Sequence, residues 1–329
     1  MRILFAGTPE IAIPSLNAIE QTPRSPEGRP IELVAVLTNP DTPAGRKRVP
    51  QPSPVKQWAL ERGLPAMQPP RLDAAARHEV GGYRPDLLVV VAYGRIFGPR
   101  FLALFPEGGI NLHPSLLPAY RGPSPIQVAI LAGDSETGVT VQRLALEMDA
   151  GDILAQQRIP VAPHATSEDL HRELGELGGR LLAHTVARIA DGTVRGTPQE
   201  ESRVSRCHLI RKSDGLLSWH EPAVMIERMI RAYTPWPGVR CLWKGTTLHL
   251  TAATVAPAPP DHRVPGSDDT GAVPAGKVFG VDNERGILVQ TVDGVLAVHR
   301  LKVQARKEMD FRSFLNGNPS LIGSVLEQA

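Results

Sequence analysis

Residues 109–122 read GINLHPSLLPAYRG, a short apolar strand that ends in a turn containing proline and glycine. Alternate residues of a strand point to the same side, so Asn111 and His113 project together while Ile110 and Leu112 face the opposite way. An amide and an imidazole held side by side can donate hydrogen bonds to a developing oxyanion and pass a proton, as acyl transfer requires. The same pair can instead satisfy neighbouring backbone groups, and the short spacing alone leaves both interpretations open.

Apolar runs alternate with helical patterns on both sides of this stretch. The runs at residues 2–7, 32–38 and 86–93 are nearly continuous, as is typical of strands buried on both faces of a parallel sheet. Ser53 and Pro54 suit the cap and first position of a helix that stops at Gly63. The alternation predicts an α/β domain with a doubly wound, mainly parallel, Rossmann-like sheet. Further helices are expected at residues 73–83, 124–131 and 166–191, and a strand at 138–144.

The pattern changes after residue 192. Residues 193–208 are polar and read as a linker, which separates an expected catalytic domain (1–192) from a C-terminal domain (209–329). A short helix at 224–232 is followed by closely spaced strands at 240–244, 247–255, 276–281, 287–291 and 295–303. Five short strands without intervening helices predict a small, oligonucleotide/oligosaccharide-binding-like (OB-like) β-barrel. Residues Ala256–Ala275 read as a long surface loop to which no role is assigned.

Composition excludes several classes of protein. Among the 329 residues, 42% are hydrophobic and 21% charged, and the net charge of +2 does not by itself indicate a nucleic-acid partner. No apolar run approaches the roughly 18 residues that cross a bilayer, and the opening residues read as a buried strand without a secretory leader. Two cysteines give neither a disulfide framework nor zinc-ligand spacing. We therefore expect a cytoplasmic, monomeric protein without metal.

Asp149 is the third residue that stands out, in the run LEMDAGDIL at 146–154. It lies in a glycine-containing loop between two strand-like runs, where a carboxylate can hold His113 protonated by direct charge attraction or through a water. It can also cap its own turn. The turn after the first strand, Gly7-Thr8-Pro9, is not a dinucleotide fingerprint, and no phosphate-binding loop or HExxH pattern is present.

The stretch around Asn111 and His113 is similar to the signature of the 10-formyltetrahydrofolate-dependent formyltransferases. Thr137-Gly138-Val139-Thr140 and residues 149–154 match as well, with Asp149 at that family's third catalytic position. The similarity covers nearly the whole chain. It extends to residues 5–9 in the first turn, 41–46 in a tRNA-contacting loop, 52–56 in the following helix, 89–94 beside the folate pocket, and Trp236-Pro237 in the second domain.

This resemblance implies transfer of a formyl group from 10-formyltetrahydrofolate to the α-amino group of methionine esterified to initiator tRNA. Asn111 and protonated His113 would donate to the oxyanion, and Asp149 would favour the imidazolium and help to move the proton. The residues implied at the folate site are Ser115, Leu116, Leu117, Pro118, Val91, Tyr93 and Gly94. Arg46, Lys47 and Arg48 would contact tRNA, although the residues after Arg46 depart from the family's usual pattern.

Three alternatives remain open from the sequence. The acceptor can be an amino sugar or another small amine, or water can accept the formyl group. A tRNA-binding protein with an inactive catalytic domain is the third, although the intact set of Asn111, His113 and Asp149 disfavours it.

Overall fold

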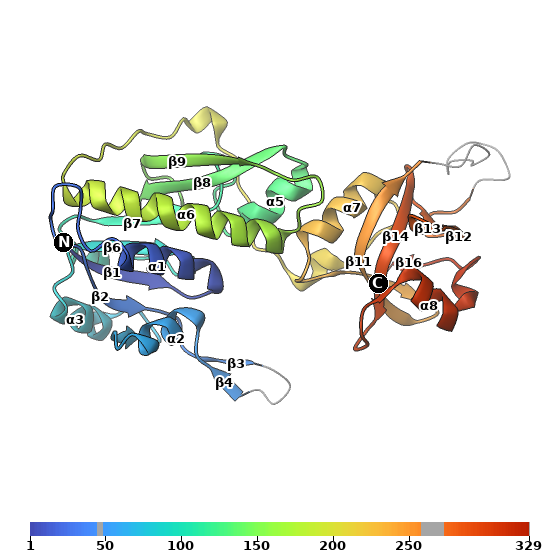
Figure 1. The fold of residues 1–329 in the computed structure, drawn as a ribbon, viewed down its shortest axis with the longest axis horizontal. Coiled ribbons are helices and arrows are strands. Elements are labelled where there is room, and N and C mark those ends of the chain that lie inside the picture. Colours follow the sequence, from blue (N-terminus) through green and yellow to red (C-terminus); the bar gives the residue numbers. More distant parts are fainter. Residues whose placement is uncertain (45–48, 258–272, 329) are drawn as a thin grey trace. The chain divides into compact units, whose positions relative to one another are not determined.

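A computed structural model describes residues 1–44, 49–257 and 273–328. The chain forms two compact units (Figure 1), each considered by itself. Unit 1 comprises Met1–Pro125, Glu136–Val161 and Leu170–His208; unit 2 comprises Ile126–Ser135, Ala162–Asp169 and Leu209–Ala329. Residues 193–208, expected to form a linker, therefore pack within unit 1. The arginine cluster Arg46, Lys47 and Arg48 and most of the Ala256–Ala275 loop lie outside the described residues.

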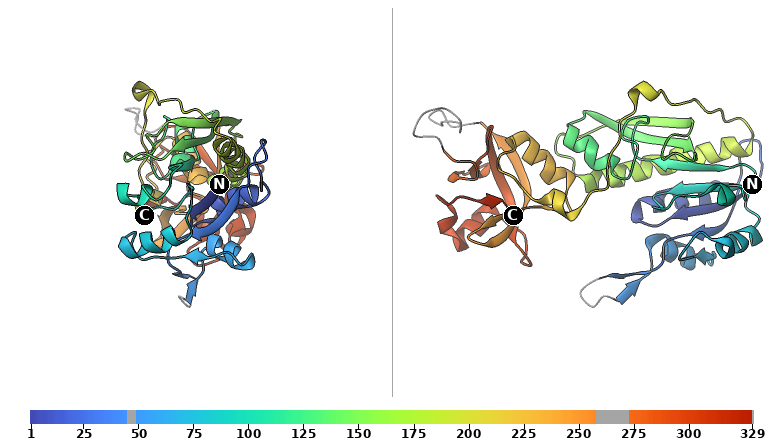
Figure 2. Two further views of the ribbon diagram at one scale, coloured as in Figure 1. Left: turned by 90° about the vertical axis from the view of Figure 1, so that its left-hand side faces the viewer. Right: turned by 180° about the vertical axis from the view of Figure 1, so that it is seen from behind.

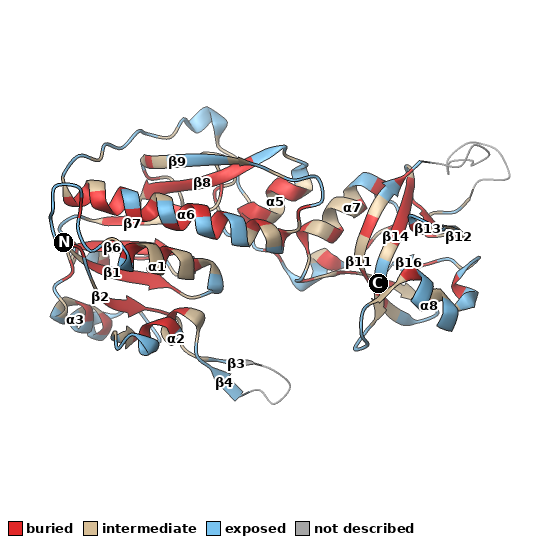
Figure 3. Ribbon diagram, viewed as in Figure 1, coloured by how far each residue is buried: buried red, intermediate tan, exposed pale blue. Residues whose placement is uncertain are grey.

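Unit 1 is built on one seven-stranded sheet of order β5-β2-β1-β6-β7-β8-β9. The first five strands in that order are parallel, and β8 and β9 are antiparallel additions, so the predicted mainly parallel sheet is confirmed. The strands are β1 (Arg2–Gly7), β2 (Glu32–Leu37), β5 (Ala66–Met67), β6 (Leu87–Val91), β7 (Gly109–His113), β8 (Glu136–Arg143) and β9 (Ile153–Pro160). The central strands are almost wholly buried (Figure 3), as their continuous apolar runs predict.

Helices cover both faces of this sheet, so the doubly wound arrangement is confirmed (Figure 2). On one face, Leu112 of β7 lies against Gly178 of α6, and α6 also contacts Pro14 of α1. On the other, Leu88 and Val90 pack with Val80 of α3 and with Phe97, Phe101 and Phe105 in and around α4. The helices of unit 1 are η1 (Glu10–Ala12), α1 (Ile13–Glu20), α2 (Pro54–Glu61), α3 (Ala74–Gly82), α4 (Pro99–Leu102), η2 (Glu201–Arg203) and most of α6 (Ser167–Ala190), whereas α5 (Pro125–Ala132) falls almost entirely in unit 2.

The predicted helix starts are confirmed by their caps. The Ser53 side chain accepts a hydrogen bond from the Lys56 backbone N–H at the start of α2, and Asp73 does the same for Ala76 in α3. Between β2 and α2, the short strands β3 (Thr42–Ala44) and β4 (Val49–Gln51) form a separate two-stranded ribbon that the sequence analysis did not identify.

Unit 2 contains a curled antiparallel sheet of order β12-β13-β14-β11-β10-β16, with β15 paired to β14. Its edges approach each other, because the chain that enters β16 also forms a bridge between Lys277, beside β12, and Val325. This arrangement agrees with the predicted OB-like domain. The elements are η3 (Lys212–Gly215), α7 (Ala223–Ala232), β10 (Val239–Trp243), β11 (Thr246–Ala256), β12 (Val278–Asp282), β13 (Gly286–Gln290), β14 (Val295–Val303), β15 (Met309–Asp310), α8 (Phe311–Gly317), η4 (Pro319–Leu321) and β16 (Glu327–Gln328). Across the described residues, no helix is both long and apolar enough to span a membrane.

Candidate active site

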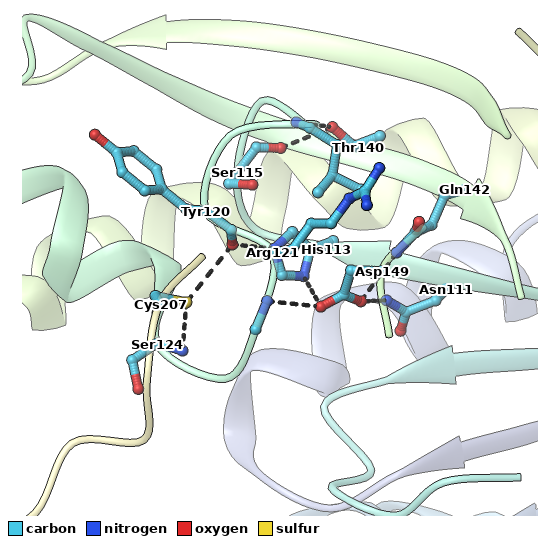
Figure 4. Close-up of polar contacts among 12 residues, drawn as sticks. Asn111, His113, Ser115, Tyr120, Arg121, Ser124, Thr140, Gln142, Asp149 and Cys207 are labelled. Carbon is cyan, nitrogen blue, oxygen red and sulfur yellow. Dashed lines mark hydrogen bonds and ion pairs between the residues drawn. The ribbon is translucent and has the colours of Figure 1, made fainter. Parts of the chain in front are cut away.

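Asn111, His113 and Asp149 come together over one face of the unit 1 sheet (Figure 4). Asn111 and His113 are alternate residues of β7, on the face opposite to Leu112. The Asp149 carboxylate lies 3.5 Å from the Asn111 amide nitrogen and 3.6 Å from His113 Nδ1. The carboxylate and the imidazole are mostly buried, with side-chain exposures of 13% and 5%. Electrostatic interactions between them are therefore screened less than on the surface.

The antiparallel direction of β8 explains the course of the loop that carries Asp149. β8 runs antiparallel to β7, so its last residues lie beside the beginning of β7, with Arg143 opposite Ile110. The loop then folds back toward His113, and Asp149 adopts a left-handed conformation with φ of 55°. Gly151 allows this tight return, because a Cβ there would lie 1.8 Å from the Arg143 carbonyl oxygen.

Both oxygens of the Asp149 carboxylate accept hydrogen bonds. The Gly122 backbone N–H donates to Oδ2 at 2.9 Å, and the Gln142 side-chain amide donates to Oδ1 at 3.0 Å. The Gly122 contact joins the loop after β7 to the loop after β8. These contacts fix the carboxylate in the orientation that faces the imidazole.

His113 is hydrogen-bonded at one ring nitrogen and faces a carboxylate with the other. Nε2 lies 3.0 Å from the Tyr120 carbonyl oxygen, which can only accept, so this nitrogen carries a hydrogen. Nδ1 faces the Asp149 carboxylate at a distance too long for a direct hydrogen bond. The ring is therefore fixed in orientation, while Nδ1 keeps the capacity to exchange a proton with a third group.

The loop Ser115–Pro118 is braced from β8 and β9. Thr140 Oγ1 donates to the Ser115 carbonyl at 2.7 Å and accepts from the Leu117 N–H at 3.2 Å. Gln156 donates to the Leu117 carbonyl at 2.9 Å. Ser115 and Leu117 are buried, whereas Leu116 and Pro118 are half-buried. Of the four, Leu116 and Pro118 therefore offer the most accessible side-chain surface.

The other residues implied at a folate site lie at the end of β6. Val91 and Tyr93 are buried, and the Tyr93 ring stacks on Phe97 with centroids 5.3 Å apart. Burial raises the pKa of the Tyr93 hydroxyl. Gly94 is exposed, with φ of 78°. Here the accessible surface comes from the backbone around Gly94, and the Val91 and Tyr93 side chains belong to the core.

The root of the β3–β4 ribbon is anchored by Asp41. Its carboxylate accepts from Lys56 Nζ and from Gln68 Nε2, each at 2.7 Å. These two donors hold the pKa of Asp41 below its ordinary value. Arg46, Lys47 and Arg48 fall between β3 and β4 in the sequence, outside the described residues.

Sequence reasoning missed Gln142, which lies directly opposite Asn111 in the β7–β8 register, as Thr140 lies opposite His113. Both side chains thus share the face of the candidate site. The available signal was the alternation of the polar residues Thr140 and Gln142 with the apolar residues Val139 and Val141. In the part of the chain that the structure describes, no group of three or more His, Cys, Asp or Glu side chains is placed to hold a metal ion.

Comparisons with known proteins extend over nearly the whole chain. Residues 1–186 match the family model described as formyl transferase, and residues 209–319 match the model of the formyl transferase C-terminal domain. A protein of Treponema denticola named methionyl-tRNA formyltransferase is 40% identical over 99% of this chain and 100% of its own length. A protein of Roseiflexus castenholzii with the same name is 40% identical over 96% of both chains.

A solved structure shares the fold at lower sequence identity. The N-formyltransferase from Helicobacter canadensis, in complex with folinic acid and dTDP-3-aminofucose, has a TM-score of 0.62 and 19% identity, covering 90% of this chain and 98% of that one.

Proposed function

The chain belongs to the formyl transferase family, and from this premise we propose that it transfers the formyl group of 10-formyltetrahydrofolate to the α-amino group of methionine on initiator tRNA. The observation that carries the proposal is the convergence of Asn111, His113 and Asp149. The choice of tRNA as acceptor is supported by relatives named methionyl-tRNA formyltransferase that align along their full length.

The three side chains suit the proton and charge movements of this reaction. The attacking amine forms a bond to the formyl carbon and places negative charge on the formyl oxygen. The Asn111 amide donates to that oxygen, and loss of one such donor costs about a hundredfold to a thousandfold in rate. The C–N bond to the donor then breaks, the amine has lost one proton, and the departing folate nitrogen gains one.

His113 and Asp149 serve the proton transfer. Nδ1 of His113 is the ring nitrogen without a direct hydrogen bond, so it can take the amine proton and return it to the leaving nitrogen. Asp149 stabilises the positive charge that the ring acquires while it holds the proton. Because the leaving group needs only a proton, this route involves no metal ion.

Folate and tRNA contacts divide between the two parts of the chain. We place the folate beside Leu116, Pro118 and the backbone around Gly94. The acceptor end of the tRNA approaches the segment with Arg46, Lys47 and Arg48, and the C-terminal domain, residues 209–329, contacts phosphates.

One feature of unit 2 supports phosphate contacts. Arg240, His249 and Lys302 lie side by side on adjacent strands β10, β11 and β14, and all three are half-buried. Their neighbours Cys241, Leu248 and Leu301 are buried, so the three basic residues share the outer face of the sheet. The cations Arg240 and Lys302, with the imidazole of His249 between them, fit a nucleic-acid backbone.

A comparison of acceptors tests the proposal. The purified protein is mixed with 10-formyltetrahydrofolate and either methionyl initiator tRNA or a dTDP-linked amino sugar, and formylated product is measured. We expect product only on the charged tRNA, and none from His113→Ala, which should still bind tRNA. Formylation of the amino sugar alone, or formate release without any acceptor at the full turnover rate, would overturn the assignment.

A further inference from the structure

The segment 193–208 is hydrogen-bonded to both loops that form the candidate site. Thr197 exchanges two backbone hydrogen bonds with Ile153, just after the Asp149 loop, at 2.8 and 2.9 Å. Further along, the Arg121 N–H donates to the Ser205 carbonyl at 2.9 Å, and the Cys207 N–H donates to the Arg121 carbonyl at 2.8 Å. The segment is thus docked at two places, and Gln199 lies between them.

Gln199 makes four polar contacts, all directed at the site. Its amide nitrogen lies 2.8 Å from the Asp149 carbonyl oxygen, 2.8 Å from the Gly151 carbonyl oxygen and 3.2 Å from Gln142 Oε1. Its amide oxygen accepts from Nε of Arg121 at 3.0 Å. Backbone carbonyls only accept and a guanidinium only donates, so the orientation of the Gln199 amide is determined by its partners.

The contacts form a chain of hydrogen bonds with one direction. Arg121, whose side chain has no exposed surface, donates to Gln199; Gln199 donates to Gln142; and Gln142 donates to the Asp149 carboxylate. Because the first member can only donate, each amide must turn its oxygen toward Arg121 and its nitrogen toward Asp149. Asp149 is therefore the terminal acceptor.

We propose that Gln199 is a positioning residue for Asp149 in formyl transfer, a role that rests on the function proposed above. Its amide nitrogen binds the backbone carbonyls of Asp149, which is in the left-handed conformation, and of Gly151. It also orients the Gln142 amide that donates to the carboxylate. None of the hydrogen bonds described for its side chain goes to His113 or Asn111. Its effect on the reaction therefore passes through the place and orientation of Asp149.

Gln199→Glu tests this role. The variant keeps an acceptor for Arg121 but sets an oxygen against the carbonyls of Asp149 and Gly151, so the loop must move. We expect kcat on methionyl-tRNA to fall about 10- to 100-fold, as for a small displacement of a reacting group, while KM for both substrates stays within about twofold. Gln199→Met, which lacks the donor and adds no charge, should lower kcat in the same direction.

The control is Gln157→Glu, on β9. The structure describes no side-chain hydrogen bond for Gln157, so this variant adds the same charge without the same contacts and should keep wild-type kcat. Melting temperatures show whether each variant is folded.

Two measurements separate positioning from general stability. In the Asp149→Asn background, adding Gln199→Glu should lower kcat by less than about twofold, because the carboxylate that Gln199 positions is already absent. Backbone amides of residues 149–152 should exchange hydrogen faster in Gln199→Glu and Gln199→Met than in the wild type. Any one of three results would overturn the proposal. The first is a full, additive loss of kcat in the Asp149→Asn background, and the second is a raised KM with unchanged kcat. The third is unaltered hydrogen exchange at the backbone amides of residues 149–152.

The exchange measurement does not depend on the reaction. If the wild-type protein formylates no methionyl-tRNA, the proposed function fails, while exchange still reports whether Gln199 holds the Asp149 loop.

Discussion

Replacing Asp149 with Asn removes the negative charge beside His113 and keeps the size of the side chain. The two carboxylate oxygens accept from the Gly122 N–H and from Gln142. An asparagine oxygen can replace the first acceptor, and its nitrogen then faces the Gln142 amide. The Asn111 amide, 3.5 Å from the same oxygen, faces that nitrogen as well. The fold should tolerate this change, since it affects only these side-chain contacts around residue 149 and leaves the size of the side chain unchanged.

The expected rate loss follows from the distance between the charges. At 3.6 Å and an effective dielectric constant of 20, a unit negative charge stabilises a unit positive charge by about 4–5 kcal/mol. Each tenfold change in rate corresponds to about 1.4 kcal/mol. Loss of the full interaction would therefore lower the rate by at most somewhat more than a thousandfold. Because a neutral amide dipole retains part of it, we expect kcat to fall about 100- to 1000-fold.

The assay is single-turnover formylation of methionyl initiator tRNA at saturating 10-formyltetrahydrofolate, with the melting temperature measured on the same preparation. The variant should melt close to the wild type and bind both substrates normally. A kcat within about fivefold of wild type, in a folded protein, would show that the carboxylate does not stabilise a charge on His113, and the reasoning would be refuted.

Three further predictions concern the scaffold and unit 2. Gly138→Ala would set a Cβ 2.1 Å from the Gln157 carbonyl oxygen, so we expect a loss of about 1–3 kcal/mol in unfolding free energy by denaturant titration; Gly280→Ala, with nothing within 4 Å, is the control and should be close to neutral. Lys302→Ala should lower the slope of log affinity for tRNA against log salt by about one, and an unchanged slope would remove this residue from the interface. Burial and three neighbouring cations hold the pKa of His249 below its ordinary value of 6.5. The unfolded chain therefore binds this proton more readily, and the contribution of His249 to stability decreases as the pH falls below 6.5. Denaturation at a series of pH values should show that dependence weakened in His249→Gln.

The sheet of unit 1 was predictable because its central strands have nearly continuous apolar sequences. Residues 2–7, 32–38 and 86–93 are almost wholly apolar, and each lies in a strand buried on both faces. The capping residues Ser53 and Asp73 likewise mark real helix starts. The barrel strands of unit 2 were found by their spacing, whereas β15 and β16, of two residues each, are too short to leave a pattern.

The candidate site was only partly predictable. Asn111 and His113 share a face by strand periodicity alone, but the return of the Asp149 loop depends on the antiparallel direction of β8, which no local pattern encodes. Gln199 was missed for a different reason. Its segment is polar and lacks periodicity, so it resembles a linker, and its packing on unit 1 depends on hydrogen bonds with residues far away in sequence.

The position of strand β7 also depends on the residues that pack on the face opposite to the candidate site. Leu112 lies on the opposite face of β7 from Asn111 and His113. A methyl group on Gly178 of α6 would lie 2.6 Å from Cδ2 of Leu112. A methyl group at residue 178 therefore requires the Leu112 side chain, or the strand that carries it, to shift. Packing on the face of the sheet opposite to the candidate site therefore helps to set where Asn111 and His113 lie.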